Sequence, residues 1–188
     1  MKLQNFVLSL IILLSFDVAA QVTINDVTLP ASITADGNTL VLNGGGIRKK
    51  LFFKLYTAGL YLPAKNKNAA DIIGADKATG IRMTMTSSVI NSDNMSEAIN
   101  EGFGKSLKGN TKAFQSKIDM LVSTFKSEEI KEGDLFELVY VPGVGVKASK
   151  NGKLKNTIPG LDFKKALFGI WLGEDPVDSS LKDGLLGN

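Results

Sequence analysis

Apolar and polar residues alternate along several short stretches of the chain, a pattern typical of β-strands with two different faces. Residues 22–28 and 81–87 alternate, residues 135–141 are apolar and β-rich, and strands are also expected over 39–42, 144–148 and 153–158. The strongest strand pattern covers residues 47–62, where both faces are mostly apolar, so we expect this strand in the interior of a sheet. The pairs Asp36-Gly37 and Asn151-Gly152 favour tight turns between neighbouring strands. The pattern predicts an antiparallel-rich sheet.

Between these strands the apolar residues no longer recur at every second position but at every third or fourth position, which is typical of a helix. Helical stripes cover residues 95–107, 114–125 and 163–171, and shorter helices are expected near 68–74 and 181–185. Asn94, with Glu97 three residues later, is the expected N-terminal cap of the first long helix. Two strand groups, each followed by a pair of amphipathic helices, predict an α+β fold in which helices cover the sheet.

Residues 1–20 resemble a secretory signal peptide: Lys2 precedes an apolar run over 6–16, and small residues lead to Ala20. The run is shorter than the roughly 20 apolar residues that span a bilayer. An uncleaved anchor is the alternative. We expect cleavage after Ala20, no stable membrane anchor afterwards, and one domain over 21–188 located in the periplasm or secreted.

The chain has 188 residues and contains no cysteine and no histidine. This composition excludes disulfide scaffolds, cysteine or histidine nucleophiles, Ser-His-Asp triads and zinc sites built from these residues. No cofactor is predicted. The net charge is only +3 and the basic residues are spread along the chain, which argues against nucleic acid as a partner.

Arg48 is a candidate binding residue because it follows three consecutive glycines and enters the strongest strand. Such glycines permit a close backbone approach or a bulge. Arg48 would then either reach solvent or a carboxylate, or lie in an apolar cleft and bind a planar anion. Tyr56 and Tyr61 are expected on opposite faces of the strand. Gly102, within the first long helix, indicates either close helix packing or room for a ligand.

Four blocks of sequence resemble the chalcone isomerase-like family, in its order and across nearly all of residues 21–188. They are GGGIR at 44–48, KLYTAGLYL at 54–62, IRMTM at 81–85 and ALFGIWLG at 166–173. The resemblance implies an open-faced β-sandwich in which helices cover a large antiparallel sheet. This agrees with the α+β fold that the apolar pattern predicts.

The resemblance implies two kinds of function. In catalytic members, the Arg at the position of Arg48 orients an anionic oxygen, and hydroxyl and amide residues stabilise the charge of cyclisation. Here those positions hold Tyr56 (or the adjacent Thr57), Met95, Gly102 and, late in the chain, Lys164. Met95 cannot donate a hydrogen bond, and losing one donor to an oxyanion costs about 2.7 to 4 kcal/mol of barrier.

Non-catalytic relatives resemble fatty-acid-binding proteins, in which the equivalent Arg holds a carboxylate and the tail lies between sheet and helices. We therefore expect an exported, non-catalytic protein that binds a fatty acid or similar amphipathic anion. The expected site consists of Arg48, Tyr56, Thr57, Met95, Gly102 and Phe103. The alternatives are an intramolecular lyase with an unknown substrate, and a structural or interaction protein whose cleft is filled by side chains.

Overall fold

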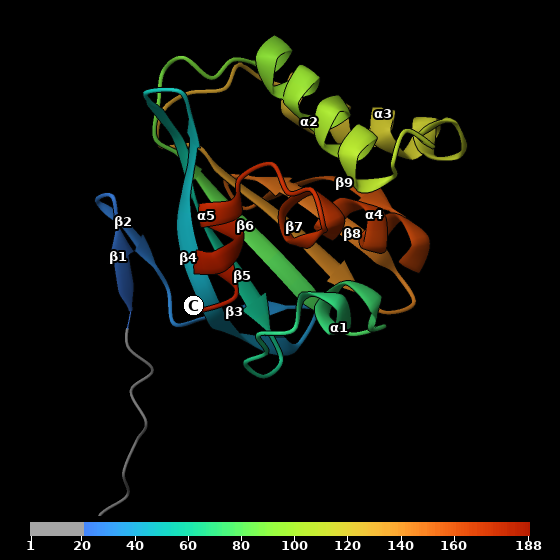
Figure 1. Ribbon diagram of the computed structural model, residues 1–188, viewed down its shortest axis with the longest axis horizontal. Coiled ribbons are helices and arrows are strands. Elements are labelled where there is room, and N and C mark those ends of the chain that lie inside the picture. Colours follow the sequence, from blue (N-terminus) through green and yellow to red (C-terminus); the bar gives the residue numbers. More distant parts are fainter. Residues whose placement is uncertain (1–20) are drawn as a thin grey trace, which may run out of the picture.

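The computed structural model describes residues 21–188, so the expected signal peptide lies outside the described residues. Its centre is a seven-stranded antiparallel sheet (Figure 1). The strands follow chain order: β3 (Ser32–Ala35), β4 (Asn38–Lys50), β5 (Phe53–Leu62), β6 (Thr79–Met85), β7 (Leu135–Val141), β8 (Gly145–Lys150) and β9 (Lys153–Ile158). A separate hairpin consists of β1 (Val22–Ile24) and β2 (Val27–Leu29).

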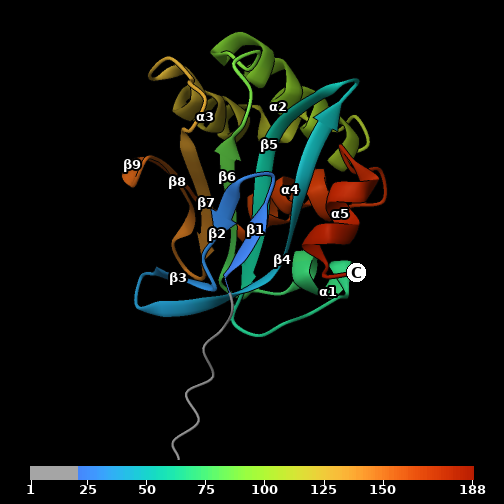
Figure 2. The ribbon, with the colours of Figure 1, turned by 90° about the vertical axis from the view of Figure 1, so that its left-hand side faces the viewer.

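The helices gather on one face of this sheet, whereas the β1–β2 hairpin lies on the other (Figures 1 and 2). They are α1 (Ala69–Gly74), α2 (Ser92–Ser106), α3 (Gln115–Lys126), α4 (Leu161–Leu172) and α5 (Ser179–Leu185). The α+β prediction of helices over an antiparallel sheet is confirmed. Within residues 21–188, none of the helices is both long and apolar enough to cross a membrane.

The predicted single strand over 47–62 is wrong, because the chain reverses at its centre. β4 ends at Lys50, β5 begins at Phe53, and these two residues pair across a two-residue turn. The turn consists of Leu51 and Phe52, with Leu51 at φ +55°. Leucine and phenylalanine are not usual turn residues, so the sequence contains no turn signal at this point. The apolar pattern therefore runs unbroken across the reversal, and one long strand was expected.

The glycines of β4 allow neighbouring segments on both faces of the sheet to come close. A Cβ at Gly44 would lie 2.8 Å from the amide nitrogen of Gly187 and would also collide with the carbonyl oxygen of Gly184 in α5. A Cβ at Gly45 would instead collide with Leu29 of the β1–β2 hairpin. The close-approach interpretation is confirmed: α5 packs directly on the backbone of β4.

Two apolar clusters line the two faces of the sheet. The large one joins β5 to β9 with the helices and contains Tyr56. The small one lies under the β1–β2 hairpin and contains Tyr61, Leu29 and Leu40. The prediction that Tyr56 and Tyr61 lie on opposite faces is confirmed.

The N-terminus of α2 differs from the expected cap. Asn91, not Asn94, is the N-cap, and its side chain accepts from the backbone of Asp93 and Asn94. Asn94 completes a capping box by accepting from the backbone nitrogen of Asn91. Because Asn replaces the usual Glu or Gln at this position, the box was not visible in the sequence.

Candidate ligand-binding site

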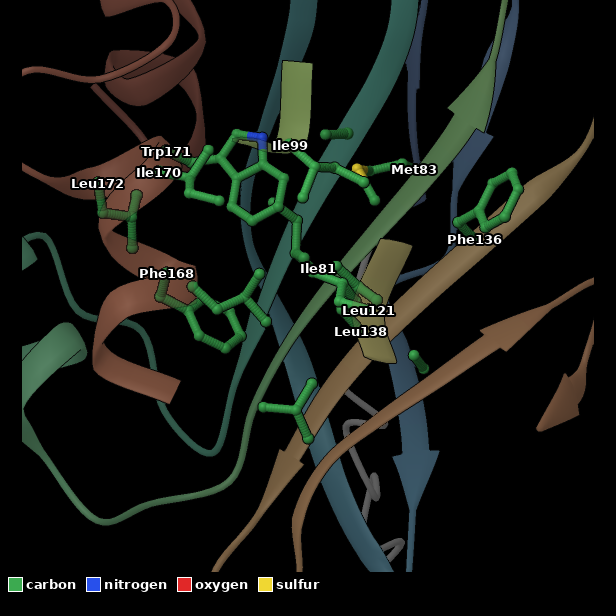
Figure 3. Close-up of a cluster of buried hydrophobic side chains, with 14 of the residues drawn as sticks. Ile81, Met83, Ile99, Leu121, Phe136, Leu138, Phe168, Ile170, Trp171 and Leu172 are labelled. Carbon is green, nitrogen blue, oxygen red and sulfur yellow. The ribbon is translucent and has the colours of Figure 1, made fainter. Parts of the chain in front are cut away.

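A cavity of about 260 Å³ lies between the sheet and the helices, so side chains do not fill this cleft. Figure 3 shows the buried apolar cluster that adjoins it, with Trp171 and Ile170 of α4 on one side and Met83 of β6 on the other; all three residues line the cavity. Most of the lining is apolar, and it comes from β5, β6, β7, α2, α3, α4 and the segment before α2: Leu55, Met83, Leu138, Ile90, Met95, Ala98, Ile99, Leu121, Phe125, Leu167, Ile170 and Trp171. Such a surface suits a hydrocarbon.

Arg48 lines the cavity, whose other charged and amide side chains are Lys50, Asn94 and Glu101. Its Nη1 lies 3.6 Å from Oδ2 of Asp178 and donates to the carbonyl of Lys49, and the side chain is 19% exposed. Pairing with a carboxylate and lining an apolar cavity, which the sequence left as alternatives, therefore occur together. Both contacts use Nη1, so among the described residues Nη2 and Nε remain able to donate to a ligand.

Asp178 fixes the position of Arg48 from the far end of the chain. Its Oδ1 accepts from the backbone of Leu181 at 3.1 Å as the N-cap of α5, and its Oδ2 accepts from the backbone of Lys49 at 3.0 Å. Gly44 admits α5 to the strand, so the glycines that precede Arg48 also bring its partner within reach. The sequence did not indicate this pairing, because Asp178 is distant in the chain and belongs to no motif.

Tyr56 pairs with Arg48 in the register of β4 and β5 and adds a hydroxyl to the same part of the cavity. Its oxygen accepts from Nε1 of Trp171 at 3.0 Å. Burial raises the pKa of Tyr56, and the hydrogen bond from Trp171 and the charge of Arg48 only partly oppose this effect. The phenol is therefore neutral at neutral pH, and its O–H can donate to an anion.

Of the remaining expected site residues, Met95 of α2 lines the cavity. Its unbranched thioether can adapt to varied hydrocarbon shapes. Trp171 also lines the cavity and was not among the expected site residues, although it lies in the helical stripe over 163–171 and in one of the family blocks. Its position on the apolar stripe was the signal that could have identified it.

Three expected site residues lie outside the cavity, which corrects the prediction. Thr57 follows Tyr56 on the strand and therefore faces the β1–β2 hairpin, with its hydroxyl 3.5 Å from the carbonyl oxygen of Ile24. A Cβ at Gly102 would lie 2.8 Å from Cγ2 of Ile170, so this glycine permits close packing of α2 on α4. Phe103 is fully buried and stacks on a neighbouring aromatic ring, with centroids 5.5 Å apart.

Lys164, at the late position that the resemblance singled out, also lies away from the cavity. It is fully buried, and its Nζ donates to the carbonyls of Ile73 at 3.0 Å and Ala75 at 2.9 Å, and to that of Ile72. Burial lowers the pKa of Lys164 to about 8. The side chain thus satisfies the carbonyls at the end of α1. Among residues 21–188, no cluster of three or more acidic, His or Cys side chains could hold a metal ion.

Comparisons with known proteins identify the family and the fold. The chalcone isomerase-like family model matches residues 21–187. A crystal structure of a fatty-acid binding protein from Arabidopsis thaliana is similar, with a TM-score of 0.71 and 18% sequence identity. The alignment covers 89% of this chain and 96% of that one, and at this identity it demonstrates a shared fold. A search of curated proteins finds no match. The chain belongs to the chalcone isomerase-like family.

Proposed function

We propose that this protein binds a fatty acid or a similar single-chain amphipathic anion and does not catalyse a reaction on it. The carboxylate would bind Nη2 and Nε of Arg48 together with the O–H of Tyr56, and the hydrocarbon would enter the cavity. The observation that carries the proposal is an arginine with free donors in the lining of a mostly apolar cavity. The Arabidopsis thaliana fatty-acid binding protein, which has the same fold, is consistent with it.

The size of the cavity narrows the ligand class. Its volume of about 260 Å³ lies just below the range of about 300–1,000 Å³ that is common for ligand sites. One hydrocarbon chain of medium length is therefore a better candidate than a two-chain lipid or a polycyclic compound. Each buried methylene contributes about 0.8 kcal/mol, so chain length should control affinity until the cavity is full.

The test is a titration with dodecanoate, followed by the fluorescence of Trp171, which is the single tryptophan of the chain and lines the cavity. We expect Arg48→Gln to weaken dodecanoate binding about 10- to 100-fold, since hydrogen bonds to charged groups contribute about 1.5–3 kcal/mol. Dodecanol, which has the same chain and no charge, should bind wild type and Arg48→Gln within about threefold of each other.

Arg82→Gln is the matched control, because Arg82 pairs with Glu137 at 3.4 Å and does not line the cavity. This variant should bind dodecanoate as tightly as wild type. The proposal fails if wild type binds no dodecanoate by fluorescence and by native mass spectrometry, or if Arg48→Gln binds it as tightly as wild type.

An intramolecular lyase is the second candidate, because Arg48 and the neutral phenol of Tyr56 line the same part of the cavity. Met95 of α2 supplies no donor to a developing oxyanion, which favours binding over turnover. A decrease in the absorbance of a chalcone on incubation with the protein, abolished in Tyr56→Phe, would support the lyase. Unchanged absorbance would count against it.

The proposed location is the periplasm or the cell exterior, on the basis of the pattern in residues 1–20. Expression of the full chain in a bacterial host should yield a processed protein outside the cytoplasm. N-terminal sequencing should then begin at Gln21. A full-length protein in the cytoplasmic fraction would contradict this location.

A further inference from the structure

The tip of the β4–β5 hairpin exposes large apolar side chains to solvent. Leu51 is 84% exposed, Phe52 98% and Phe53 49%. The hairpin tip projects at the same end of the molecule as α2 (Figures 1 and 2). Exposed apolar residues are normal when scattered singly, but three in succession at a projecting tip require an explanation.

A second hairpin of the same sheet shows that the turn itself does not require these residues. β8 and β9 also join through two residues, with Lys150 and Lys153 as the closing pair. Their turn is Asn151-Gly152, at φ +51° and +77°. Leu51 adopts φ +55°, which is strained for a leucine and easy for asparagine or glycine. The β4–β5 turn thus retains a leucine against the local backbone preference, and strain of this kind gathers at functional sites.

Basic side chains surround this apolar tip. Lys49, Lys50 and Lys54 are exposed, and the sequence contains no acidic residue between Asp36 and Asp71. Aromatic and leucine side chains bury themselves at the headgroup boundary of a bilayer, and adjacent lysines attract anionic headgroups. Double-stranded nucleic acid or an acidic peptide would use the lysines and leave the protruding phenylalanine and leucine exposed.

We propose that the β4–β5 hairpin docks on a lipid bilayer that carries anionic headgroups. Leu51 and Phe52 enter the headgroup–acyl boundary, and the lysines remain at the level of the phosphates. The docking uses only the hairpin tip, so it does not depend on what the cavity binds.

Docking would place the mouth of the cavity against the bilayer. The exposed residues of the cavity lining mark this mouth: they include Lys50, Leu51 and Phe53 of the hairpin, Val89, which is 41% exposed, and one carboxylate, Glu101 of α2. A fatty acid could then pass between bilayer and cavity without exposing its chain to water. This consequence, unlike the docking itself, rests on the proposed function.

The test is cosedimentation with vesicles of phosphatidylcholine, with and without a quarter of phosphatidylglycerol. Every variant is prepared in the same way as wild type. If residues 1–20 are retained, their contribution to vesicle binding is then the same in all the proteins compared. Wild type should bind the anionic vesicles. Phe52→Ser should reduce this binding about fivefold or more, because the phenyl ring loses its burial. Lys49→Gln/Lys50→Gln should reduce it about tenfold on anionic vesicles and leave binding to neutral vesicles unchanged.

Leu154→Ser is the matched control, since Leu154 is 54% exposed beside the turn of the β8–β9 hairpin. It should bind vesicles as wild type does. The proposal is overturned if wild type does not bind anionic vesicles, if Phe52→Ser binds as well as wild type, or if Phe52→Ser instead converts a dimer to a monomer in analytical ultracentrifugation.

Dodecanoate titration in the absence of vesicles separates this proposal from the proposed function. Phe52 does not line the cavity, so Phe52→Ser should bind dodecanoate like wild type. If dodecanoate fails to bind wild type while vesicles still do, the binding function is wrong and the docking surface stands. The reverse outcome overturns only the docking.

Discussion

Consecutive residues of β5 face two differently packed sides of the sheet. Tyr56 faces the helices, where a cavity of about 260 Å³ remains. Thr57 faces the β1–β2 hairpin, whose side chains reach the sheet directly: a Cβ at Gly59, further along the strand, would lie 3.3 Å from Cδ1 of Leu29. The first face therefore has room for a ligand, whereas the second is closed by the protein's own side chains.

The difference follows from what covers each face. The side chains of a helix hold its rigid backbone away from the sheet. The exception is a glycine on the strand, such as Gly44, which lets the backbone of α5 approach the backbone of β4. A two-stranded hairpin of short strands can settle onto the sheet until its leucine and isoleucine side chains fill the space. Helical cover thus permits a cavity, and β1–β2 leaves little room for one.

The largest expected effect on stability comes from replacing a β4 glycine by alanine, which adds a methyl group to one face of the sheet or the other. Gly44→Ala should lower the free energy of unfolding by about 3 kcal/mol, because its Cβ would meet backbone atoms of α5. Gly45→Ala should cost about 1 kcal/mol, since the nearest obstacle is the end of the Leu29 side chain, which can shift more easily than backbone. Urea unfolding measures both.

Only Gly44→Ala should also weaken dodecanoate binding, because α5 carries the carboxylate that holds Arg48. Gly74→Ala is the control: its Cβ would meet nothing within 4 Å, and it should leave both quantities nearly unchanged. Equal destabilisation by Gly44→Ala and Gly45→Ala would contradict the distinction between a backbone contact and a side-chain contact.

Alkaline pH should show how completely the hairpin face excludes water. Tyr61 is fully buried, its hydroxyl donates to the carbonyl of Pro30 at 3.1 Å, and burial raises its pKa to about 12. The unfolded chain ionises this tyrosine near pH 10 and the folded protein near pH 12. Stability from Tyr61 is therefore complete below pH 10 and falls as the pH rises to 12, by about 2 kcal/mol or slightly more.

The measurement is urea unfolding of wild type and Tyr61→Phe at pH 9 and pH 11.5. Wild type should lose about 2 kcal/mol more than Tyr61→Phe between these two pH values. Because each protein is compared with itself at the two pH values, the free energy of the lost hydrogen bond to Pro30 drops out. The contributions of other ionising groups, which are the same in both proteins, drop out as well. Identical pH dependence in the two proteins would show that water reaches the phenol.

The features that the sequence predicted depend on local patterns. The turn at Asn151-Gly152 is recognisable because both residues tolerate positive φ, and the apolar stripes fix which face of each helix is buried. Alternation along one strand placed Tyr56 and Tyr61 on opposite faces. It also shows why Thr57 cannot share a cavity with Tyr56, because adjacent strand residues point to opposite faces.

The features that it missed depend on contacts between distant segments or on residues that oppose local preference. The turn at Leu51 and Phe52 breaks the usual turn composition. Gly102 is compatible with either a ligand or a neighbouring helix, and only the position of α4 decides between them. The carboxylate beside Arg48 belongs to Asp178, the N-cap of α5. No local pattern in the sequence specifies that α5 packs on β4.

The smallest expected effect on stability comes from removing one hydroxyl, either that of Tyr56 on the cavity side or that of Thr57 on the hairpin side. Tyr56→Phe leaves the buried N–H of Trp171 without its acceptor, which should cost about 1–2 kcal/mol of unfolding free energy. It should also shift the emission of Trp171 and weaken dodecanoate binding severalfold, because one donor to the carboxylate is lost. Thr57→Val removes a contact of 3.5 Å and should cost less than about 1 kcal/mol.

Thr57→Val should leave both the emission of Trp171 and the affinity for dodecanoate unchanged, because the sheet separates Thr57 from the cavity. Urea unfolding, emission spectra and dodecanoate titration of the two variants measure all three quantities on the same preparations. If Thr57→Val altered ligand affinity as much as Tyr56→Phe, the ligand would have to reach the hairpin face, and the contrast between a hollow and a filled side of β5 would be wrong.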